Sequence, residues 1–280
     1  MSEQKKDDKW SSEAYQHSAS FVPKLATKVV QWLDVQKDDA ILDIGCGDGV
    51  LDVEFGKVLA RGNGFLHGID ASPAMISAAK KAIEVEGLSN CEFEVLDATK
   101  IATSETPSLH NPTFNKAFSN AALHWILRPP GSHVPVFTSI RDALLPGGTL
   151  VLEMGGLGNV AEMRTALLMA VARRVGMAKA READPWFFPD EAWLKRVLEE
   201  DVGGWVVERV EREWRPTTAD RGGVEGWVRL MGKEILDAVP GEEREEVVRE
   251  IVEVLSEVCK IPGGGEMISY VRLRCLARKL

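Results

Sequence analysis

Cysteine is scarce in this chain, and its few cysteines stand far apart. The 280 residues contain four cysteines, at positions 46, 91, 259 and 275, and none has a second cysteine or a histidine at a metal-ligand spacing. The pattern argues against a zinc module and against a disulfide scaffold. We therefore predict no metal site and free thiols in a reducing compartment.

Long hydrophobic runs are also missing. No segment approaches the ~18 consecutive apolar residues that a membrane span needs. The first residues are polar and charged, without the apolar centre of a secretion signal. We therefore expect a cytoplasmic protein with no secretion signal and no membrane partner.

Positive charge is in deficit. The chain has 34 Lys and Arg against 43 Asp and Glu, which gives a net charge of −9 and a pI of about 5.2. Nucleic-acid-binding proteins usually carry a basic face, and no Lys/Arg cluster stands out here, so nucleic acid is not an expected partner. With 45% hydrophobic residues, the length suits one large domain, or one domain plus a cap.

The most informative stretch is AILDIGCGDGV, residues 40–50. An apolar run with Asp43 near its end predicts a buried parallel strand, and the alternating glycines that follow predict a tight turn into a helix. Glycines let the backbone approach a ligand closely, and a helix N-terminus offers free N–H groups. The stretch is therefore interpreted as a cofactor cradle. A dinucleotide site would need the third glycine later, because its motif is Gly-x-Gly-x-x-Gly, whereas Gly49 comes one residue early.

Two further apolar runs also end in an acid. Residues 65–70 finish at Asp70, about 20 residues after the glycine turn, where an acid binds a ribose diol in related nucleotide folds. Residues 91–97 alternate in polarity and finish at Asp97. Ser72 and Pro73 are suited to cap and begin the helix that follows Asp70. Because the carboxyl ends of parallel strands share one edge of a sheet, three acids at these ends predict one ligand site.

Taken together, the Asp-x-Gly-x-Gly-x-Gly motif and the three acids resemble the class I methyltransferases that use S-adenosylmethionine (SAM). The resemblance implies SAM as cofactor and S-adenosylhomocysteine as product. In that family the three acids serve the ammonium, the ribose and the adenine amine of SAM. The cofactor-binding residues expected from it are Asp43, Gly45, Cys46, Gly47, Gly49, Asp70, Ala71, Met75, Asp97, Ala98, Asn120 and Ala121. For Met75, plain core packing is the alternative.

The segment SNAALHW, residues 119–125, follows the expected fourth strand, where the methyl group of SAM would point in this family. Base-modifying enzymes carry an Asn/Asp-Pro-Pro-aromatic motif here, whereas this segment resembles the trans-aconitate 2-methyltransferase group and its small-molecule relatives. His124 is the first choice for substrate contact or general base. His17 is the second choice for general base, and it belongs with Tyr15, the third catalytic candidate, to an N-terminal segment of a kind that folds over the pocket in many relatives. The alternative for these two residues is that they only anchor this segment on the surface. A histidine that bonds locally within a helix is the alternative for His124.

Several aromatic residues are expected to line the part of the site that binds the methyl acceptor. Trp125 is predicted to contact the acceptor, as are Trp186 and Phe187, which form with Phe188 an aromatic run between two prolines. Arg128 is assigned to an anionic acceptor. The alternative is that the aromatic residues only pack a cap onto the main domain. The related enzymes carry an Arg near the position of Val22, and its absence disfavours a tricarboxylate-like acceptor and favours a more apolar one.

The expected architecture is an α/β fold with a doubly wound, seven-stranded, mostly parallel sheet and helical cap insertions. By resemblance, the last strand inserts antiparallel. We expect an arm or lid over residues 1–21, a SAM-binding core over 22–156 and a helical cap over 157–204. The rest of the sheet, with a second helical insertion, occupies 205–280.

The expected function is SAM-dependent methyl transfer to a small molecule, with O-methylation of a carboxylate or hydroxyl favoured, by a monomer or homodimer. A carboxylate acceptor needs no base, whereas a hydroxyl or amine does. Two alternatives stay open at this point. One is a SAM-binding regulator without catalysis, and the other is a nicotinamide-dependent oxidoreductase, which the early Gly49 disfavours.

Overall fold

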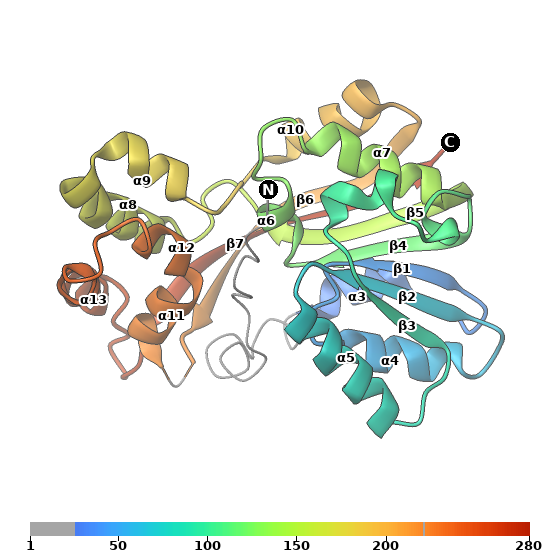
Figure 1. The fold of residues 1–280 in the computed structure, drawn as a ribbon, viewed down its shortest axis with the longest axis horizontal. Helices are drawn as coiled ribbons and strands as arrows, with labels where there is room; N and C mark the ends of the chain where they lie inside the picture. The colour runs from blue at the N-terminus through green and yellow to red at the C-terminus, as the bar shows by residue number, and fades with distance from the viewer. Residues whose placement is uncertain (1–25, 221) are drawn as a thin grey trace, which may run out of the picture.

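The structure is a computed structural model that describes residues 26–220 and 222–280. One seven-stranded sheet runs through it in the order β3-β2-β1-β4-β5-β7-β6 (Figure 1). Its strands are β1 (Ala40–Ile44), β2 (Phe65–Asp70), β3 (Cys91–Val95), β4 (Phe114–Asn120), β5 (Leu144–Gly155), β6 (Trp205–Thr218) and β7 (Met267–Lys279). Strands β1 to β5 pair in parallel, and β7 is antiparallel to both β5 and β6. The predicted sheet and its antiparallel last strand are confirmed.

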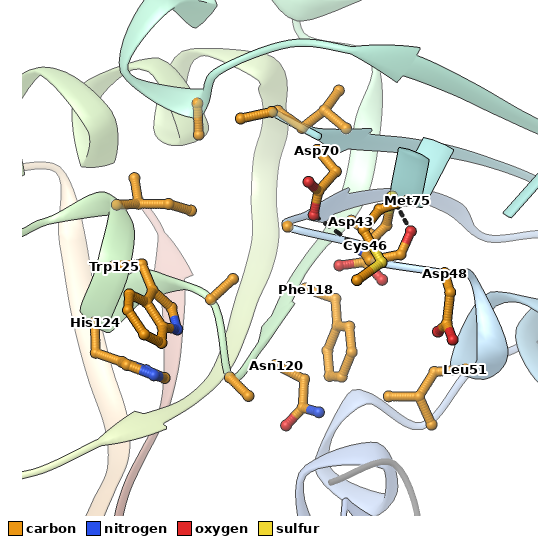
Figure 2. A pocket seen from close by; sticks show the side chains of 18 of the residues that line it. Asp43, Cys46, Asp48, Leu51, Asp70, Met75, Phe118, Asn120, His124 and Trp125 are labelled. Carbon is orange, nitrogen blue, oxygen red and sulfur yellow. Dashed lines mark hydrogen bonds between the residues drawn. The ribbon is translucent and has the colours of Figure 1, made fainter. Parts of the chain in front are cut away.

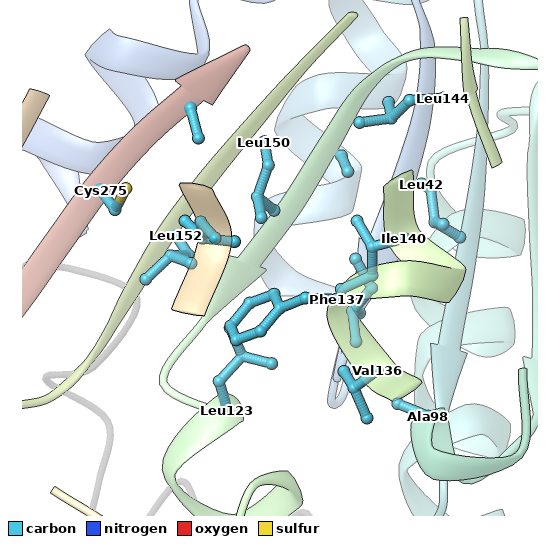
Figure 3. Packing of buried hydrophobic residues seen from close by; sticks show 14 of the residues in the cluster. Leu42, Ala98, Leu123, Val136, Phe137, Ile140, Leu144, Leu150, Leu152 and Cys275 are labelled. Atoms are coloured by element: carbon cyan, nitrogen blue, oxygen red, sulfur yellow. The ribbon is translucent and has the colours of Figure 1, made fainter. Parts of the chain in front are cut away.

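Helices cover both faces of this sheet, because its central strands are apolar on both sides. Ile41 belongs to the core beneath one set of helices, and its neighbour Leu42 belongs to the core beneath the other. The first set is α3 (Thr27–Leu33), α4 (Val50–Leu59) and α5 (Pro73–Val85). The second is α6 (Leu123–Ile126), α7 (His133–Ala143) and α10 (Glu191–Arg196). Figure 3 shows Phe137 and Ile140 of α7 packed over Leu150 and Leu152 of β5.

The remaining helices form a cap beside the sheet, at the left of Figure 1. They are α8 (Ala161–Val175), α9 (Met177–Ala183), α11 (Gly223–Met231), α12 (Lys233–Leu236) and α13 (Arg244–Val258). Leu167 of α8, Val228 of α11 and Ile251 of α13 share one buried apolar cluster. The helical segments expected separately after β5 and after β6 therefore pack as one cap. Helix α10 is an exception, because its Leu194 packs in the core beside α7.

Over residues 26–220 and 222–280, three short elements complete the fold: η1 (Ala98–Thr103), η2 (Pro107–Leu109) and the π-helical turn η3 (Val197–Val202). Within the described ranges, no helix combines the length and the apolarity that a bilayer crossing requires. The same residues contain no group of three or more His, Cys, Asp or Glu side chains placed to hold a metal ion.

Candidate active site

A cavity lies at the carboxyl edge of β1, β2 and β4 and extends to the cap. Its walls include every predicted cofactor residue except Gly49. Figure 2 shows the acids Asp43 and Asp70 at one end, with His124 and Trp125 across the cavity from them. The structure thus brings the predicted cofactor residues other than Gly49, and the predicted acceptor residues His124, Trp125 and Trp186, to opposite ends of one space.

The glycine turn is built so that the backbone, rather than side chains, borders this cavity. Gly45 has a φ of 75°, and a Cβ atom there would come within 2.2 Å of the Ala122 Cβ. Gly47 has a φ of 58°, and a Cβ atom there would meet open space. Gly49 lies behind the cavity, where a Cβ atom would come within 2.9 Å of the Cβ of Ala79 on α5. Each position therefore needs glycine, and Gly47 leaves its space open to a ligand.

Asp70 ties the turn to the following helix. Its Oδ2 accepts a hydrogen bond from the Gly47 N–H at 3.1 Å, and its Oδ1 accepts one from the Ser72 N–H at 2.8 Å. Ser72 in turn caps α5, because its Oγ accepts from the Met75 N–H at 3.1 Å. The side chain of Asp70 is therefore held at the cavity edge before any ligand arrives.

Two carboxyl groups are buried beneath the turn. Asp43 is 3% exposed and Asp52, in the first turn of α4, is 0% exposed. Asp43 Oδ1 and both carboxyl oxygens of Asp52 receive no N–H or hydroxyl donor within the described ranges, and the two carboxyl groups are close enough to share a hydrogen bond when one of them is protonated. Burial raises the pKa of Asp52 to about 7, and burial with the charge of Asp52 raises the pKa of Asp43 well above its usual range. A ligand cation beside Asp43 would relieve this cost, so the site fits the ammonium of SAM.

The third predicted acid and the nearby thiol have different roles in the wall. Asp97 caps η1, since its Oδ1 accepts from the Thr99 N–H at 2.9 Å and from the Thr99 hydroxyl at 2.8 Å. Ala98 and Met75 line the cavity beside it.

Burial, and then the neighbouring carboxylates, raise the pKa of the Cys46 thiol. Cys46 is therefore a protonated wall residue rather than a nucleophile.

His124 lies at the other end of the cavity, on α6. Its Nδ1 accepts a hydrogen bond from the Gly155 N–H at 3.3 Å. Burial, followed by the nearby charge of Arg272, lowers the pKa of His124 to about 3. The imidazole is therefore neutral near pH 7, and its single proton is on Nε2.

Aromatic rings surround His124. Trp125 and Trp186 line the cavity and meet edge to face, with ring centroids 5.7 Å apart. Trp186 stacks on Phe188 with centroids 6.0 Å apart and planes 12° apart. Phe187 supports this wall from outside the cavity: its N–H donates to the His124 carbonyl at 2.9 Å, and its ring packs on that of Trp193.

The structure places Arg128 away from the cavity. Its guanidinium donates to the backbone carbonyls of Asp184 and Glu182, and so holds the segment that carries Trp186. Tyr15 and His17 lie outside the described residues.

Several wall residues were not predicted from the sequence. They are Asp48, Val50, Leu51, Ile69, Leu96, Phe118, Ala122, Ile126, Asn159, Val160, Trp227, Met231, Tyr270 and Arg272. Most are apolar residues whose position only the fold reveals. Arg272 had a readable signal, because two arginines alternate within the otherwise largely apolar run YVRLRCLA, residues 270–277. A charged residue inside a buried strand calls for a partner or a ligand.

Comparison with known proteins agrees with this geometry. A sequence family described as "Methyltransferase domain" matches residues 35–191. An uncharacterized methyltransferase of Schizosaccharomyces pombe is 36% identical over 277 residues, which cover 98% of this chain and 99% of the relative. Trans-aconitate 2-methyltransferase of Streptomyces coelicolor is 27% identical over 85% of this chain and 76% of its own length.

Solved structures share the fold. A candidate methyltransferase of Bacillus halodurans aligns with a TM-score of 0.58 at 15% identity, over 91% of this chain and 99% of that one. Shorter sequence matches include enzymes named for tRNA, carrier-protein and protein-lysine substrates. Similarity therefore agrees on the type of domain and differs on the acceptor.

Proposed function

The chain belongs to the SAM-dependent methyltransferase family, and from this premise we propose that it methylates an oxygen atom of a small-molecule acceptor. The cofactor, SAM, supplies an electrophilic methyl group when it is bound. The residues of this chain bind and orient the two reactants and exclude water, which is how a transferase of this kind lowers the barrier.

We assign the cofactor contacts to the acid end of the cavity. Asp43 would receive the ammonium, because its buried carboxyl lacks a donor on Oδ1. Asp70 would bind the ribose diol, and Asp97 the adenine amine, each from the end of a strand that lines the cavity. The open space at Gly47 would take the ligand against the backbone.

The aromatic wall at the acceptor end is the observation that carries the assignment to a small molecule. Side chains of α6, the 184–188 segment, α11 and β7 all line it. A concave, largely apolar wall with a few polar groups is typical of small-molecule sites. The net charge of −9 also disfavours a polyanionic acceptor such as RNA.

Assignment to oxygen follows from the state of His124. A base for a neutral hydroxyl or amine must take up a proton. The Nδ1 of His124 already accepts the Gly155 N–H, and its pKa of about 3 makes it a poor base. We therefore assign His124 a positioning role, in which Nε2–H donates to the acceptor. An acceptor that arrives as an oxygen anion needs no base.

The test is transfer of radiolabelled methyl from SAM into separated small-molecule, RNA and protein fractions of a cell extract. We expect label in the small-molecule fraction with the wild-type protein, and almost none with the Asp70→Ala variant. Label confined to RNA or protein would contradict the proposed acceptor class. Tight binding of S-adenosylhomocysteine without transfer into any fraction would instead indicate a SAM-binding regulator.

A further inference from the structure

Arg272 is a buried cation at the acceptor end of the cavity. It lies on β7, is 2% exposed and lines the cavity wall. Within the described ranges its Nε has no hydrogen-bond partner. Burial of a guanidinium is costly unless its donors are satisfied, so the position calls for an anion.

The neighbouring carboxylate is largely engaged elsewhere. Glu153 Oε2 accepts from Arg274 Nε at 2.6 Å, whereas Arg272 Nε lies 3.4 Å from Glu153 Oε1 without forming a hydrogen bond. Arg274 also contacts Glu211 and Glu213 of β6. Among the residues that the structure describes, Arg274 therefore has three carboxylate partners, and Arg272 has one long ion pair. Arg272 also lies over the face of the Tyr270 ring, 5.1 Å from its centroid.

Arg272 and His124 flank the same stretch of β5. Gly155 pairs with Arg272 in the β5–β7 ladder, and the N–H of Gly155 donates to His124 Nδ1. The charge of Arg272 reaches the His124 ring, since it helps to lower the pKa of that side chain. Two donors, the guanidinium and the Nε2–H, thus border one region of the cavity, and both favour an acceptor oxygen that carries negative charge.

The walls around these donors are aromatic. Trp186 packs against Trp125 at 5.7 Å and against Trp227 at 5.8 Å between centroids. Trp227 Nε1 donates to the Tyr270 hydroxyl at 2.6 Å, so the polar atoms of both rings are already satisfied. Such walls suit a flat apolar body. An aromatic cage can also bind an ammonium, but Arg272 in the same wall opposes a cation here.

We propose that Arg272 is a specificity-determining residue that anchors the carboxylate of a flat, apolar monocarboxylic acid, and that this carboxylate is the methyl acceptor. The inference rests on the proposed function and narrows it to one substrate class. One carboxylate oxygen forms a bond to the methyl carbon while the carbon–sulfur bond breaks and its electron pair goes to sulfur. The products are a neutral methyl ester and neutral S-adenosylhomocysteine, and no proton moves.

Binding to the protein saturated with S-adenosylhomocysteine tests the anchor. The probes are benzoate, phenylacetate and 3-phenylpropionate, each paired with its amide and the corresponding amine, and binding is followed by tryptophan fluorescence and calorimetry. We expect at least one acid to bind tenfold or more tightly than its amide, the size expected for a charge-assisted hydrogen bond. Acids that bind no better than amides, or amines that bind best, would overturn the proposal.

Variants on one strand assign the effect to Arg272. Arg272→Met should reduce the preference for acid over amide to about one, and Arg272→Lys should keep part of it. Arg278→Met is the matched control, because Arg278 lies on the same strand, is exposed and pairs with Glu208. If Arg272→Met keeps the preference of the wild type, the anchor is wrong.

Two further measurements separate the possible failures. Unchanged affinity for S-adenosylhomocysteine shows that an Arg272 variant is folded. If the Arg272→Met variant does not fold, the role of Arg272 is judged from the Arg272→Lys variant and from the preference of the wild type for acid over amide. A product methyl that mild base releases as methanol is expected for an ester, and a base-stable methyl would overturn the carboxylate assignment. Failure of the wild type to bind S-adenosylhomocysteine would instead contradict the proposed function itself.

Discussion

At the scale of the residue, the acids of the cavity differ in what holds them. Asp70 is fixed by two backbone N–H groups, and Asp97 by the backbone and hydroxyl of Thr99. Asp43, and Asp52 buried behind the cavity wall, instead have oxygens that receive no N–H or hydroxyl donor within the described ranges, and their only carboxyl partner there is each other. The first two are therefore preorganised acceptors, and the second pair stores a desolvation cost that a ligand cation can relieve.

The first prediction concerns Asp70. Asp70→Asn keeps the shape of the side chain and removes the charge that would strengthen hydrogen bonds from the ribose. Calorimetry should give a SAM affinity at least tenfold weaker, which corresponds to roughly 1.4 kcal/mol or more. Glu92→Gln, which changes an exposed residue of β3 by the same charge, is the control. An affinity within threefold of the wild type would remove Asp70 from the cofactor site.

The second prediction concerns the pH dependence of stability. Asp52 has a folded-state pKa of about 7 against an ordinary value of 3.8. The folded protein therefore binds more protons than the unfolded chain between these values, so the free energy of unfolding falls as pH rises from about 4 to about 7. The Asp52→Asn variant has no carboxyl to ionise at this position, so its free energy of unfolding should lack the decrease that Asp52 causes. We expect the variant to match the wild type at pH 4 and to exceed it at pH 8 by roughly 1–3 kcal/mol.

Urea titrations at the two pH values would measure the difference. Glu84→Gln, an exposed substitution on α5, should leave the pH dependence of the wild type unchanged. An Asp52→Asn protein that loses stability equally with the wild type between pH 4 and pH 8 would show that the carboxyl is not the cause.

The acids could be predicted from sequence, whereas the state of His124 and the position of Arg272 could not. An acid at the end of an apolar run can be assigned to the ligand edge of the sheet, because the carboxyl ends of parallel strands meet at that edge. The proton of His124 is set by the Gly155 N–H, 31 positions along the chain. The apolar run around Arg272 signals a buried charge, but only the pairing of β7 with β5 places that charge beside Gly155 at the cavity. Contacts between segments that are far apart in the sequence leave no pattern in the residues around either segment, so these two features could not be predicted.

At the scale of the element, periodic segments were predicted closely and short ones were not. The apolar run over residues 65–70 is β2 as observed, whereas β5 begins at Leu144, before the glycines that precede the apolar run from Thr149, because Leu144 already pairs with Phe114 across a bulge. Helix α9 was missed, since Met177–Ala183 has no capping side chain and buries a single residue, Ala180. The second helical insertion, expected within 205–280, begins with two helices, α11 and α12, that Gly232 separates.

The third prediction concerns the segment that carries Trp186 and Phe188. Asp184 is 7% exposed and accepts hydrogen bonds from Arg164 Nε at 2.8 Å and from the Trp186 N–H at 3.3 Å. Asp184→Ala would free this segment and leave Arg164 without its ion pair. We expect the KM for the acceptor to rise at least fivefold and the unfolding free energy to fall by roughly 1–3 kcal/mol.

Steady-state kinetics with separate SAM binding measurements check this assignment. The affinity for SAM should stay within twofold, because the acids of the cofactor end are untouched. Asp237→Ala, which removes the exposed partner of Lys233 elsewhere in the cap, should leave the acceptor KM unchanged. An Asp184→Ala protein that weakens SAM and acceptor equally would show that the segment does not act on the acceptor end alone.

At the scale of the whole molecule, the cap is threaded into the sheet rather than appended to it. Helices α8 and α9 follow β5, and α11 to α13 lie between β6 and β7. Strand β7 then returns between β5 and β6 and brings Tyr270 and Arg272 to the cavity. The cap cannot separate from the sheet unless β7 loses its pairing with β5 and β6. We therefore expect cap and sheet to unfold together.

The last prediction follows from this threading. A ligand that binds only the folded state at 100 times its dissociation constant adds about 2.7 kcal/mol to the free energy of unfolding, which for a chain of this size raises Tm by roughly 5 °C. Because cap and sheet unfold as one unit, calorimetry should show a single transition that moves entirely with S-adenosylhomocysteine and does not move with NADH. The Asp70→Asn protein, at the same ligand concentration, should show a smaller shift. Two transitions, of which S-adenosylhomocysteine moves one, would mean that the cap is an independent unit.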